Sequence, residues 1–209
     1  MNRLWRVAAA AIALIAIAGI IIYADAQMAK SGAFPTTLWI LLRYFTITTN
    51  VLIALVFGAL ALGVAVSPRL VGGTALFIAL VGVIYDLLLQ GLGDLTAGAA
   101  VANFLLHRLT PIVGVLFWLF ATPKGRLRWI DPVLWAIYPF AYLVYALVRG
   151  AAEGIYAYPF LDVGQLGVQQ VAINAVLIAA GFMLAGWLMV LLDRFLGARS
   201  RRAPDAVGG

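Results

Sequence analysis

One histidine and a group of threonines are the side chains in this sequence best suited to group-transfer chemistry. The 209-residue chain contains a single histidine, His107, and no cysteine. The lack of cysteine excludes disulfides, thiol nucleophiles and thiolate metal sites, and one histidine excludes a multi-histidine metal centre. A threonine hydroxyl becomes a nucleophile only when a base removes its proton, which an imidazole does near neutral pH. These residue types permit hydroxyl–imidazole chemistry, and they equally suit structural roles, in which threonines bond to the backbone or to a neighbouring helix. The sequence implies no metal and no cofactor.

Polar residues stand at helical spacing inside five long apolar segments. Side chains three, four or seven positions apart share one face of a helix. Arg43, Thr46 and Asn50 follow this spacing. So do three pairs and one stripe, namely Asp86 with Gln90, Asn103 with His107, Gln170 with Asn174, and Tyr138 with Tyr142, Tyr145 and Arg149. If these faces converge, they line a polar pocket.

The elements that position these faces are predicted to be transmembrane helices. Hydrophobic residues make up 65% of the chain and charged residues 11%, against about 45–50% and 25% in soluble domains. The apolar segments are continuous rather than alternating, which favours helices over a membrane β-barrel. The predicted fold class is all-α, a polytopic membrane bundle of six transmembrane helices over residues 6–23, 38–66, 71–91, 101–121, 132–148 and 167–192.

Six helices leave no room for a separate soluble domain in a chain of this length. We expect residues 1–196 to form a single six-helix transmembrane domain and residues 197–209 to form a basic, disordered cytoplasmic tail. The N-terminal apolar run also fits a cleaved signal peptide, but it is longer than a usual signal core, so a retained first helix is favoured.

Basic residues are distributed unequally between the two sides of the predicted bundle. Lys30 and Arg149 fall on one side, and ten fall on the other, namely Arg3, Arg6, Arg69, Lys124, Arg126, Arg128, Arg194, Arg199, Arg201 and Arg202. Because Lys and Arg are enriched in cytoplasmic loops, both termini are predicted to lie in the cytoplasm. This topology accounts for the net charge of +6 without nucleic-acid binding.

With this orientation, the intramembrane polar residues gather toward the outer side. At a rise of 1.5 Å per residue, Thr46, Asp86 and His107 all lie about 8–12 Å below the outer surface, whereas the inner halves of the helices are almost purely apolar. The sequence thus predicts a polar pocket that opens outward. Charges inside a membrane are normally paired, and the expected pair is Arg43 with Asp86, either in the pocket or as an ion pair that specifies the bundle.

Four segments of the sequence resemble the motifs of a known membrane family. In order along the chain they are YFTITTN (44–50), LLHRLTP (105–111), PKGRLRW (123–129) and YAYPFLD (156–162). They fall in the second and fourth predicted helices, the basic loop and the last outer loop. Together they resemble the bacterial six-helix Pr6Pr membrane proteins, and they are more distantly similar to the eukaryotic androgen-induced-gene membrane proteins.

The resemblance implies an activity and two catalytic residues. The eukaryotic relatives hydrolyse fatty acid esters of hydroxy fatty acids with an intramembrane threonine nucleophile and a histidine. Matched by motif, these residues are Thr46 and His107, with Thr48 and Thr49 as neighbouring hydroxyls. The expected protein is therefore a lipid ester hydrolase of the bacterial cytoplasmic membrane, with membrane lipid as its partner and a lipid ester as its substrate.

Other polar residues of the pocket are expected to support this pair. Asp86 would orient the imidazole, and Arg43 or Asn50 would donate hydrogen bonds to the oxyanion. Asn103 lies one helical turn before His107 and belongs to the same supporting set.

Two other functions remain open. One is a non-enzymatic lipid-binding or structural membrane protein that keeps the pocket for packing or ligand capture. The other, ranked lower, is a small transporter, which usually needs polar residues or broken helices near the membrane midplane. Contact between Thr46 and His107 would favour hydrolysis, and their separation beyond about 7 Å would favour binding. A continuous polar path to the cytoplasmic face would favour transport. The sequence does not indicate an oligomeric state.

Overall fold

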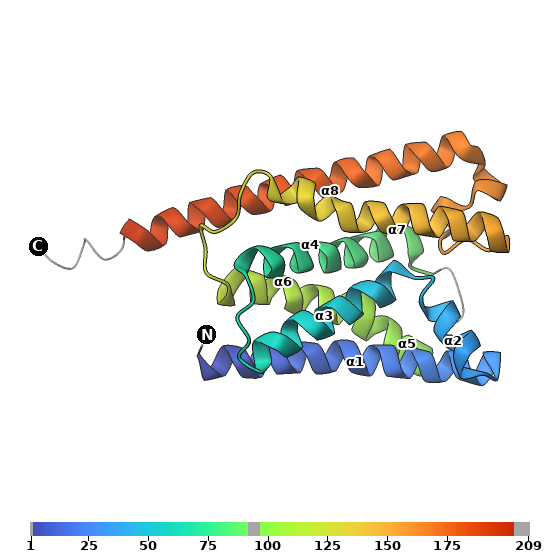
Figure 1. Cartoon of the computed structure of the whole chain (residues 1–209), viewed down its shortest axis with the longest axis horizontal. Coiled ribbons are helices and arrows are strands. Elements are labelled where there is room, and N and C mark those ends of the chain that lie inside the picture. Colours follow the sequence, from blue (N-terminus) through green and yellow to red (C-terminus); the bar gives the residue numbers. More distant parts are fainter. Residues whose placement is uncertain (1, 92–96, 203–209) are drawn as a thin grey trace, which may run out of the picture.

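The computed structural model describes residues 2–91 and 97–202, and every regular element in that part of the chain is helical (Figure 1). The α-helices are α1 (Arg3–Ser31), α2 (Phe34–Leu41), α3 (Phe45–Ala61), α4 (Pro68–Ile84), α5 (Ala97–Phe104), α6 (Thr110–Ala121), α7 (Asp131–Glu153) and α8 (Val163–Arg202). The shorter turns are the π-helices η1 (Tyr85–Leu89) and η2 (Leu105–Leu109) and the 3₁₀-helix η3 (Pro159–Leu161). The all-α prediction is confirmed for these residues.

Several helix ends follow the local chemistry of the chain. The side chain of Asn2 accepts a hydrogen bond from the Trp5 amide at 3.0 Å and caps α1. Ser67 caps α4 in the same way. Helices α1 and α7 end at Gly32 and Gly154, whose φ values of 71° and 69° are left-handed and favour glycine. These residues set where the long helices begin and end.

Most of the helices are long and apolar enough to cross a membrane. Those that qualify singly are Arg3–Ser31, Pro68–Leu89, Gly98–Ala121, Asp131–Glu153 and Val163–Arg199. These five become six if α2 and α3 count as one span, because that pair passes the same test together although it is bent by 93°. The described residues therefore form a membrane-type helical bundle with five or six candidate spans.

The prediction of one straight helix over residues 38–66 is wrong, because the chain breaks between α2 and α3. Leu42, Arg43 and Tyr44 separate the two helices, and the amides of Arg43 and Tyr44 bond only three residues back, each at 3.1 Å. The two helices together are apolar enough to pass as one span, so mean hydropathy does not reveal the break. The break leaves some main-chain carbonyls without helical partners, and side chains of α7 donate hydrogen bonds to them, as described below.

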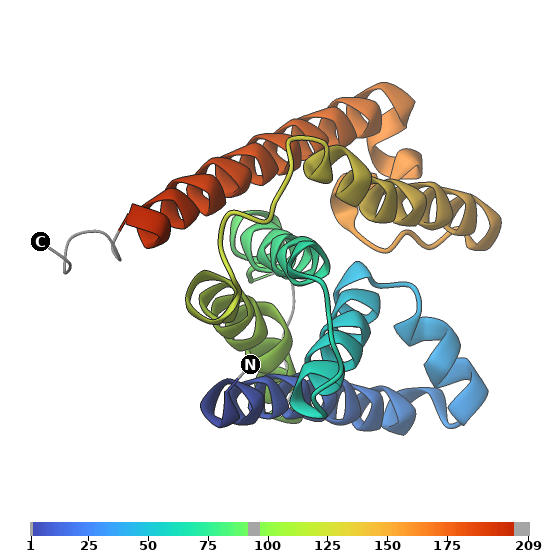
Figure 2. The same ribbon diagram turned by 60° about the vertical axis from the view of Figure 1, so that its left-hand side comes forward.

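The helices form two groups that meet at α4 (Figure 2). Helix α1 packs along α3 and against α5, and α6 packs on α4. The small residues Ala9, Ala13 and Ala16 of α1 belong to the same buried cluster as Ile53 and Phe57 of α3. Helices α7 and α8 pack on each other and reach the first group mainly through α4. The candidate site lies where these two groups meet.

The two ends of the described chain lie at one end of the bundle, where α1 begins and α8 ends (Figure 1). Helix α8 contains a non-helical residue, Gly167, with φ 74° and ψ 160°. It then continues to Arg202, so residues 197–202, predicted as part of the tail, are helical in this structure. The carboxylate of Asp193 accepts a hydrogen bond from the Leu127 amide at 2.9 Å and fastens this part of α8 to the preceding loop. Residues 203–209 of the predicted tail lie outside the described residues.

Candidate active site

Thr46 and His107 come together where α3 passes η2. Thr46 Oγ1 lies 3.1 Å from His107 Nε2, and Thr46 is only 6% exposed. The other ring nitrogen, Nδ1, lies 3.2 Å from the main-chain carbonyl oxygen of Asn103. Because a carbonyl only accepts, Nδ1 carries the proton of a neutral imidazole, and Nε2 is left to accept from the Thr46 hydroxyl. A hydroxyl and an imidazole arranged in this way can act chemically as a nucleophile and a general base.

The π-turn that carries His107 is fixed by Asn50 and Thr110. In this π-turn the Thr110 amide bonds five residues back to the carbonyl of Leu105, and Pro111 has no amide hydrogen to bond in the same way to the carbonyl of Leu106. The carbonyl of Leu106 instead accepts from Asn50 Nδ2 at 3.3 Å and from Thr110 Oγ1 at 3.2 Å. Asn50 Nδ2 also donates to the carbonyl of Thr46 at 2.9 Å. Asn50 thus ties the two reacting segments together, and its amide hydrogens are already engaged.

Tyr85 of η1 covers one face of the imidazole. The Tyr85 and His107 rings stack with centroids 4.4 Å apart and planes 28° apart. The side-chain amide of Asn103 donates to the Tyr85 hydroxyl, while its carbonyl faces His107 Nδ1. Asn103, rather than Asp86, therefore orients the imidazole. The electron-rich face of an aromatic ring stabilises a neighbouring cation, so Tyr85 would favour the imidazolium that forms when His107 takes a proton.

The predicted ion pair between Arg43 and Asp86 is wrong. Asp86 Oδ1 lies 3.3 Å from the guanidinium of Arg108, and these two side chains are 53% and 41% exposed. Arg43 Nη2 instead lies 2.6 Å from Glu153 Oε2. Arg43 precedes α3, so helical spacing does not place it on the face that carries Thr46. Asp86 lies in η1, where π-helical geometry changes the direction of successive side chains.

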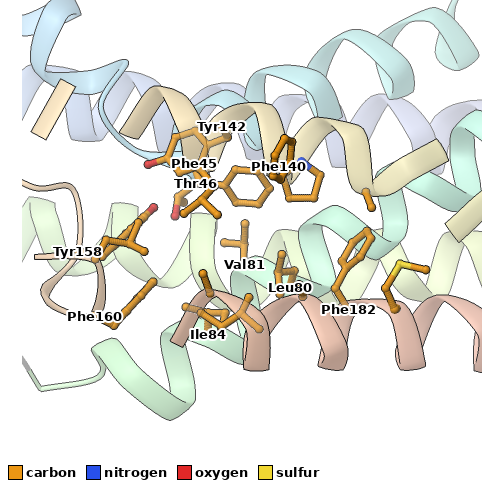
Figure 3. Close-up of a pocket in the computed structure, with 18 of the residues that line it drawn as sticks. Phe45, Thr46, Leu80, Val81, Ile84, Phe140, Tyr142, Tyr158, Phe160 and Phe182 are labelled. Atoms are coloured by element: carbon orange, nitrogen blue, oxygen red, sulfur yellow. The ribbon is translucent and has the colours of Figure 1, made fainter. Parts of the chain in front are cut away.

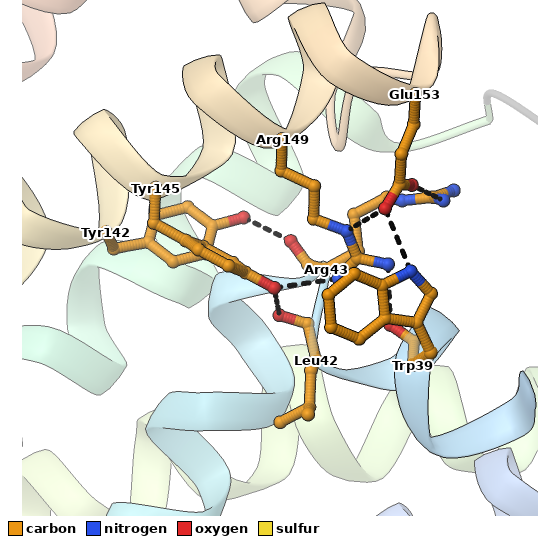
Figure 4. A network of polar contacts seen from close by, with 7 residues as sticks. All are labelled: Trp39, Leu42, Arg43, Tyr142, Tyr145, Arg149 and Glu153. Atoms are coloured by element: carbon orange, nitrogen blue, oxygen red, sulfur yellow. Dashed lines mark hydrogen bonds and ion pairs between the residues drawn. The ribbon is translucent and has the colours of Figure 1, made fainter. Parts of the chain in front are cut away.

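A second polar cluster lies at the α2–α3 break and consists of Trp39, Arg43, Arg149 and Glu153 (Figure 4). The Glu153 carboxylate accepts hydrogen bonds from all three partners, at 2.8 Å from Trp39 Nε1, 2.6 Å from Arg43 and 2.8 Å from Arg149. The Arg149 guanidinium also lies over the Trp39 ring, 4.0 Å from its centroid. We call these four residues the break cluster. It fastens the end of α7 to both sides of the break.

Side chains of α7 also bond to the main-chain carbonyls that the break leaves without helical partners. The bonds run from Tyr142 to Arg43 at 2.6 Å, from Tyr145 to Leu42 at 3.1 Å and from Arg149 to Trp39 at 2.8 Å (Figure 4). An unpaired carbonyl is costly inside a membrane, so these bonds stabilise the break. They also position the first turn of α3, which contains Thr46.

The neighbouring threonines face Tyr138 of α7. The Tyr138 hydroxyl donates to Thr48 Oγ1 at 2.9 Å and lies 3.2 Å from Thr49 Oγ1. Thr48 also donates to the carbonyl of Phe45 at 3.1 Å. Of these three threonines, Thr46 is the one that contacts His107.

Thr46 borders a cavity of about 390 Å³ between α3, α4, α7 and α8 (Figure 3). Thr46, Tyr142 and Tyr158 line its polar end, and the Tyr158 hydroxyl points toward Thr46. The remaining lining is apolar and includes Leu80 and Val81 of α4, Ile137 and Phe140 of α7, and Phe182 of α8. The threonine therefore stands between a histidine on one side and an apolar cavity on the other.

The cavity reaches the surface of the bundle along α7. Ile137 and Phe140 line it and are also 63% and 66% exposed. This exposed surface belongs to a helix that is long and apolar enough to span a membrane. In a bilayer the opening would therefore meet lipid before it meets water.

Sequence reasoning missed three residues of this region. Glu153 stands four positions after Arg149, a spacing that predicts an ion pair. Tyr85 precedes Asp86 in the sequence, but no local pattern predicts its stacking on His107. Tyr158 lies in the YAYPFLD segment, where the resemblance assigned it no role. These side chains are brought to the site by the tertiary fold.

Groups of three or more His, Cys, Asp or Glu side chains that could hold a metal ion do not occur in residues 2–91 and 97–202. No family model, curated protein or solved structure matches the chain.

Proposed function

We propose that this protein hydrolyses lipid esters inside a membrane, with Thr46 as the nucleophile and His107 as the general base. The contact of 3.1 Å between Thr46 Oγ1 and His107 Nε2 carries this proposal. Two further features support it. The Nδ1 hydrogen of His107 has its own acceptor, the carbonyl of Asn103, and Thr46 borders an apolar cavity.

The proposed reaction has two stages. His107 Nε2 takes the proton of Thr46 as Oγ1 attacks the ester carbonyl, and the carbonyl electron pair moves onto oxygen. Collapse of this tetrahedral intermediate re-forms the carbonyl and breaks the bond to the alcohol oxygen, which takes the proton from His107. Water then attacks the acyl group on Thr46 while His107 takes a proton from it. The bond to Thr46 Oγ1 breaks, this oxygen recovers its proton from His107, and the fatty acid is released.

The lining of the cavity supports a lipid ester as the proposed substrate. Its apolar lining suits an acyl chain, and its polar end would place the ester carbonyl beside Thr46. The lining runs along α7 from Tyr142 to Val133, about 13 Å at the rise of an α-helix. Because the opening lies at Ile137 and Phe140, we infer that substrate enters from the bilayer.

The test uses the full chain, purified in detergent, with p-nitrophenyl esters from acetate to palmitate and an ester of a hydroxy fatty acid. We expect Thr46→Ala and His107→Ala each to lower turnover by about 10²–10⁴-fold, the usual contribution of a positioned base. Thr48→Ala is the matched control, because Thr48 faces Tyr138 instead, and it should keep wild-type turnover. Monodisperse size-exclusion profiles establish that each variant is folded.

A lipid-binding protein without turnover is the second candidate, because apolar side chains form almost the whole cavity lining. It predicts that lipid co-purifies with the chain and that Ala136→Phe, inside the cavity, lowers the amount bound. If wild-type protein releases no fatty acid from any ester, this candidate replaces the hydrolase.

We further infer six crossings in the bacterial cytoplasmic membrane, with both termini in the cytoplasm. The ten-to-two distribution of basic residues supports this topology. Because the chain has no cysteine, single substitutions report topology directly. In intact cells, an impermeant maleimide should label Ala152→Cys at the end of α7 and spare Ser67→Cys before α4. The reverse pattern would invert the orientation.

A further inference from the structure

Ester hydrolysis by Thr46 requires a donor for the oxyanion. The tetrahedral intermediate carries a negative charge on the former carbonyl oxygen, and donors aimed at that charge supply much of the catalysis in acyl transfer. Arg43 and Asn50, the donors expected from the sequence, are engaged elsewhere. Arg43 bonds to Glu153, and Asn50 Nδ2 bonds to the carbonyls of Thr46 and Leu106.

Tyr158 is the side chain placed to fill this role. It lines the cavity beside Thr46, and its hydroxyl points toward that residue (Figure 3). The phenol interacts with the side chain and backbone of Thr46, with the backbone of Phe45 and with the side chain of Tyr142. Thr46 Oγ1 is thus flanked by the imidazole of His107 and the phenol of Tyr158, as a nucleophile is flanked by its base and its oxyanion donor.

The Tyr158 ring is held firmly by its neighbours. It stacks on Phe160 with centroids 5.1 Å apart and planes 4° apart, and it meets the Tyr44 ring edge-on at 6.1 Å. The loop beneath it is fixed to α8 by Asn174 Nδ2, which donates to the carbonyl of Phe160 at 2.9 Å. A donor held this way loses little conformational freedom when it engages a charge, which is the requirement for electrostatic preorganisation.

The hydroxyl of Tyr158 also keeps its proton. Burial raises the pKa of this phenol above its ordinary value of 10.0, so it remains a donor at neutral and mildly alkaline pH. Tyr142, the other phenol at this end of the cavity, already donates to the carbonyl of Arg43 at 2.6 Å. Tyr158 is therefore the better placed of the two to donate to a ligand.

We propose that the Tyr158 hydroxyl donates a hydrogen bond to the carbonyl oxygen of an ester bound at Thr46 and to the oxyanion that forms there. This assignment rests on the proposed hydrolase and adds a third catalytic residue to Thr46 and His107. The hydrogen bond strengthens as charge develops on the oxygen. Its loss should therefore slow the chemical step more than it weakens substrate binding.

The test compares Tyr158→Phe with Tyr156→Phe in the purified full chain. Tyr158→Phe should lower kcat by about 10²–10³-fold, the usual loss for one oxyanion donor, with a much smaller effect on KM. It should weaken a trifluoromethyl ketone, which mimics the tetrahedral intermediate, by a similar factor and weaken palmitate, which forms no tetrahedral oxyanion, much less. Tyr156 lies in the same loop, and its ring packs on Gly150, so Tyr156→Phe should match wild type.

The outcomes separate this inference from the proposed function. If the wild-type protein hydrolyses an ester and Tyr158→Phe has the same kcat, the oxyanion role is overturned and the proposed hydrolase activity stands. A lower kcat accompanied by equal losses of palmitate and ketone affinity shows a structural role and also overturns it. No turnover by wild-type protein with any ester overturns the hydrolase, and the assignment of Tyr158 falls with it.

Discussion

The two polar clusters on either side of the first turn of α3 differ in what their side chains are bonded to. In the break cluster, Glu153 accepts three donors, and Arg149 bonds to Glu153, Tyr145 and the carbonyl of Trp39. The polar groups of this cluster are therefore hydrogen-bonded to one another and to the backbone. In the pair formed by Thr46 and His107, one hydroxyl meets one acceptor nitrogen beside a cavity.

Because of this difference, we expect the two clusters to have different roles. The break cluster holds a 93° bend that a membrane helix would not adopt without partners for its carbonyls. The bend in turn sets Thr46 at the start of α3, within reach of His107 on η2. We therefore expect changes in the break cluster to act mainly on stability and changes in the pair to act mainly on turnover.

The largest loss of stability is expected from Glu153→Gln. The substitution leaves the guanidinium groups of Arg43 and Arg149 close together without a carboxylate, and an uncompensated charge of this kind is strongly destabilising. Thermal unfolding in detergent, followed by tryptophan fluorescence, measures the effect. Turnover per folded molecule should fall much less than the folded fraction.

Asp86→Asn is the control for that experiment. Its ion pair with Arg108 is exposed, and exposed pairs contribute about 0–1 kcal/mol. Equal shifts of the unfolding midpoint in Glu153→Gln and Asp86→Asn would show that the break cluster does not stabilise the bend.

A smaller loss of stability is expected from Tyr142→Phe. Removing this hydroxyl leaves the carbonyl of Arg43 without its 2.6 Å partner, and an unsatisfied buried acceptor costs about 1–3 kcal/mol. Because that carbonyl immediately precedes α3, turnover should fall as well. Chemical denaturation measures the first effect and ester release the second.

Tyr145→Phe provides the comparison on the same helix. Tyr145 is 37% exposed and bonds to the carbonyl of Leu42 at 3.1 Å, so water replaces its hydroxyl more readily. Its free energy of unfolding should lie between those of wild type and Tyr142→Phe. A larger loss for Tyr145→Phe would place the main support of the bend further along α7.

Filling the cavity should change substrate preference more than stability. Ala136→Phe adds a ring to the apolar lining, and a change of even one methylene in an apolar pocket alters selectivity by about 10–200-fold. Turnover of the palmitate ester should fall, while turnover of the acetate ester should stay near wild type. Val144→Phe, on the exposed side of α7, should leave both unchanged. Equal losses for acetate and palmitate would mean that the acyl chain lies elsewhere.

The helices and the similar depth of Thr46 and His107 could be predicted from the sequence for a simple physical reason, whereas their contact could not. Continuous apolar runs predict the helices. The rise per residue predicts how far each side chain lies below the outer surface, and it places these two side chains at a similar depth. Which threonine faces the histidine depends on rotation about the helix axis. The break at Leu42–Tyr44 determines that rotation for α3.

The break itself could not be predicted from the local sequence. The groups that satisfy its carbonyls, on Tyr142, Tyr145 and Arg149, lie about a hundred residues further along the chain. The same limit explains the wrong pairing of Arg43 with Asp86. Depth along a helix does not fix the direction of a side chain, and the bend and the π-turn η1 bring Arg43 and Asp86 to different partners.

The smallest effect is expected at the opposite end of the bundle, where Lys124 donates to the carbonyls of Trp118 and Thr122 at the end of α6. Burial lowers the pKa of Lys124 from 10.5 to about 8. Between these values the unfolded chain binds more protons than the folded one, so stability rises with pH. The unfolding midpoint of wild type should therefore rise across that window relative to Lys124→Met. Parallel pH profiles for the two proteins would contradict this. Because Lys124 contacts neither cluster, turnover per folded molecule should be the same in both, which makes this variant the baseline for separating stability from catalysis.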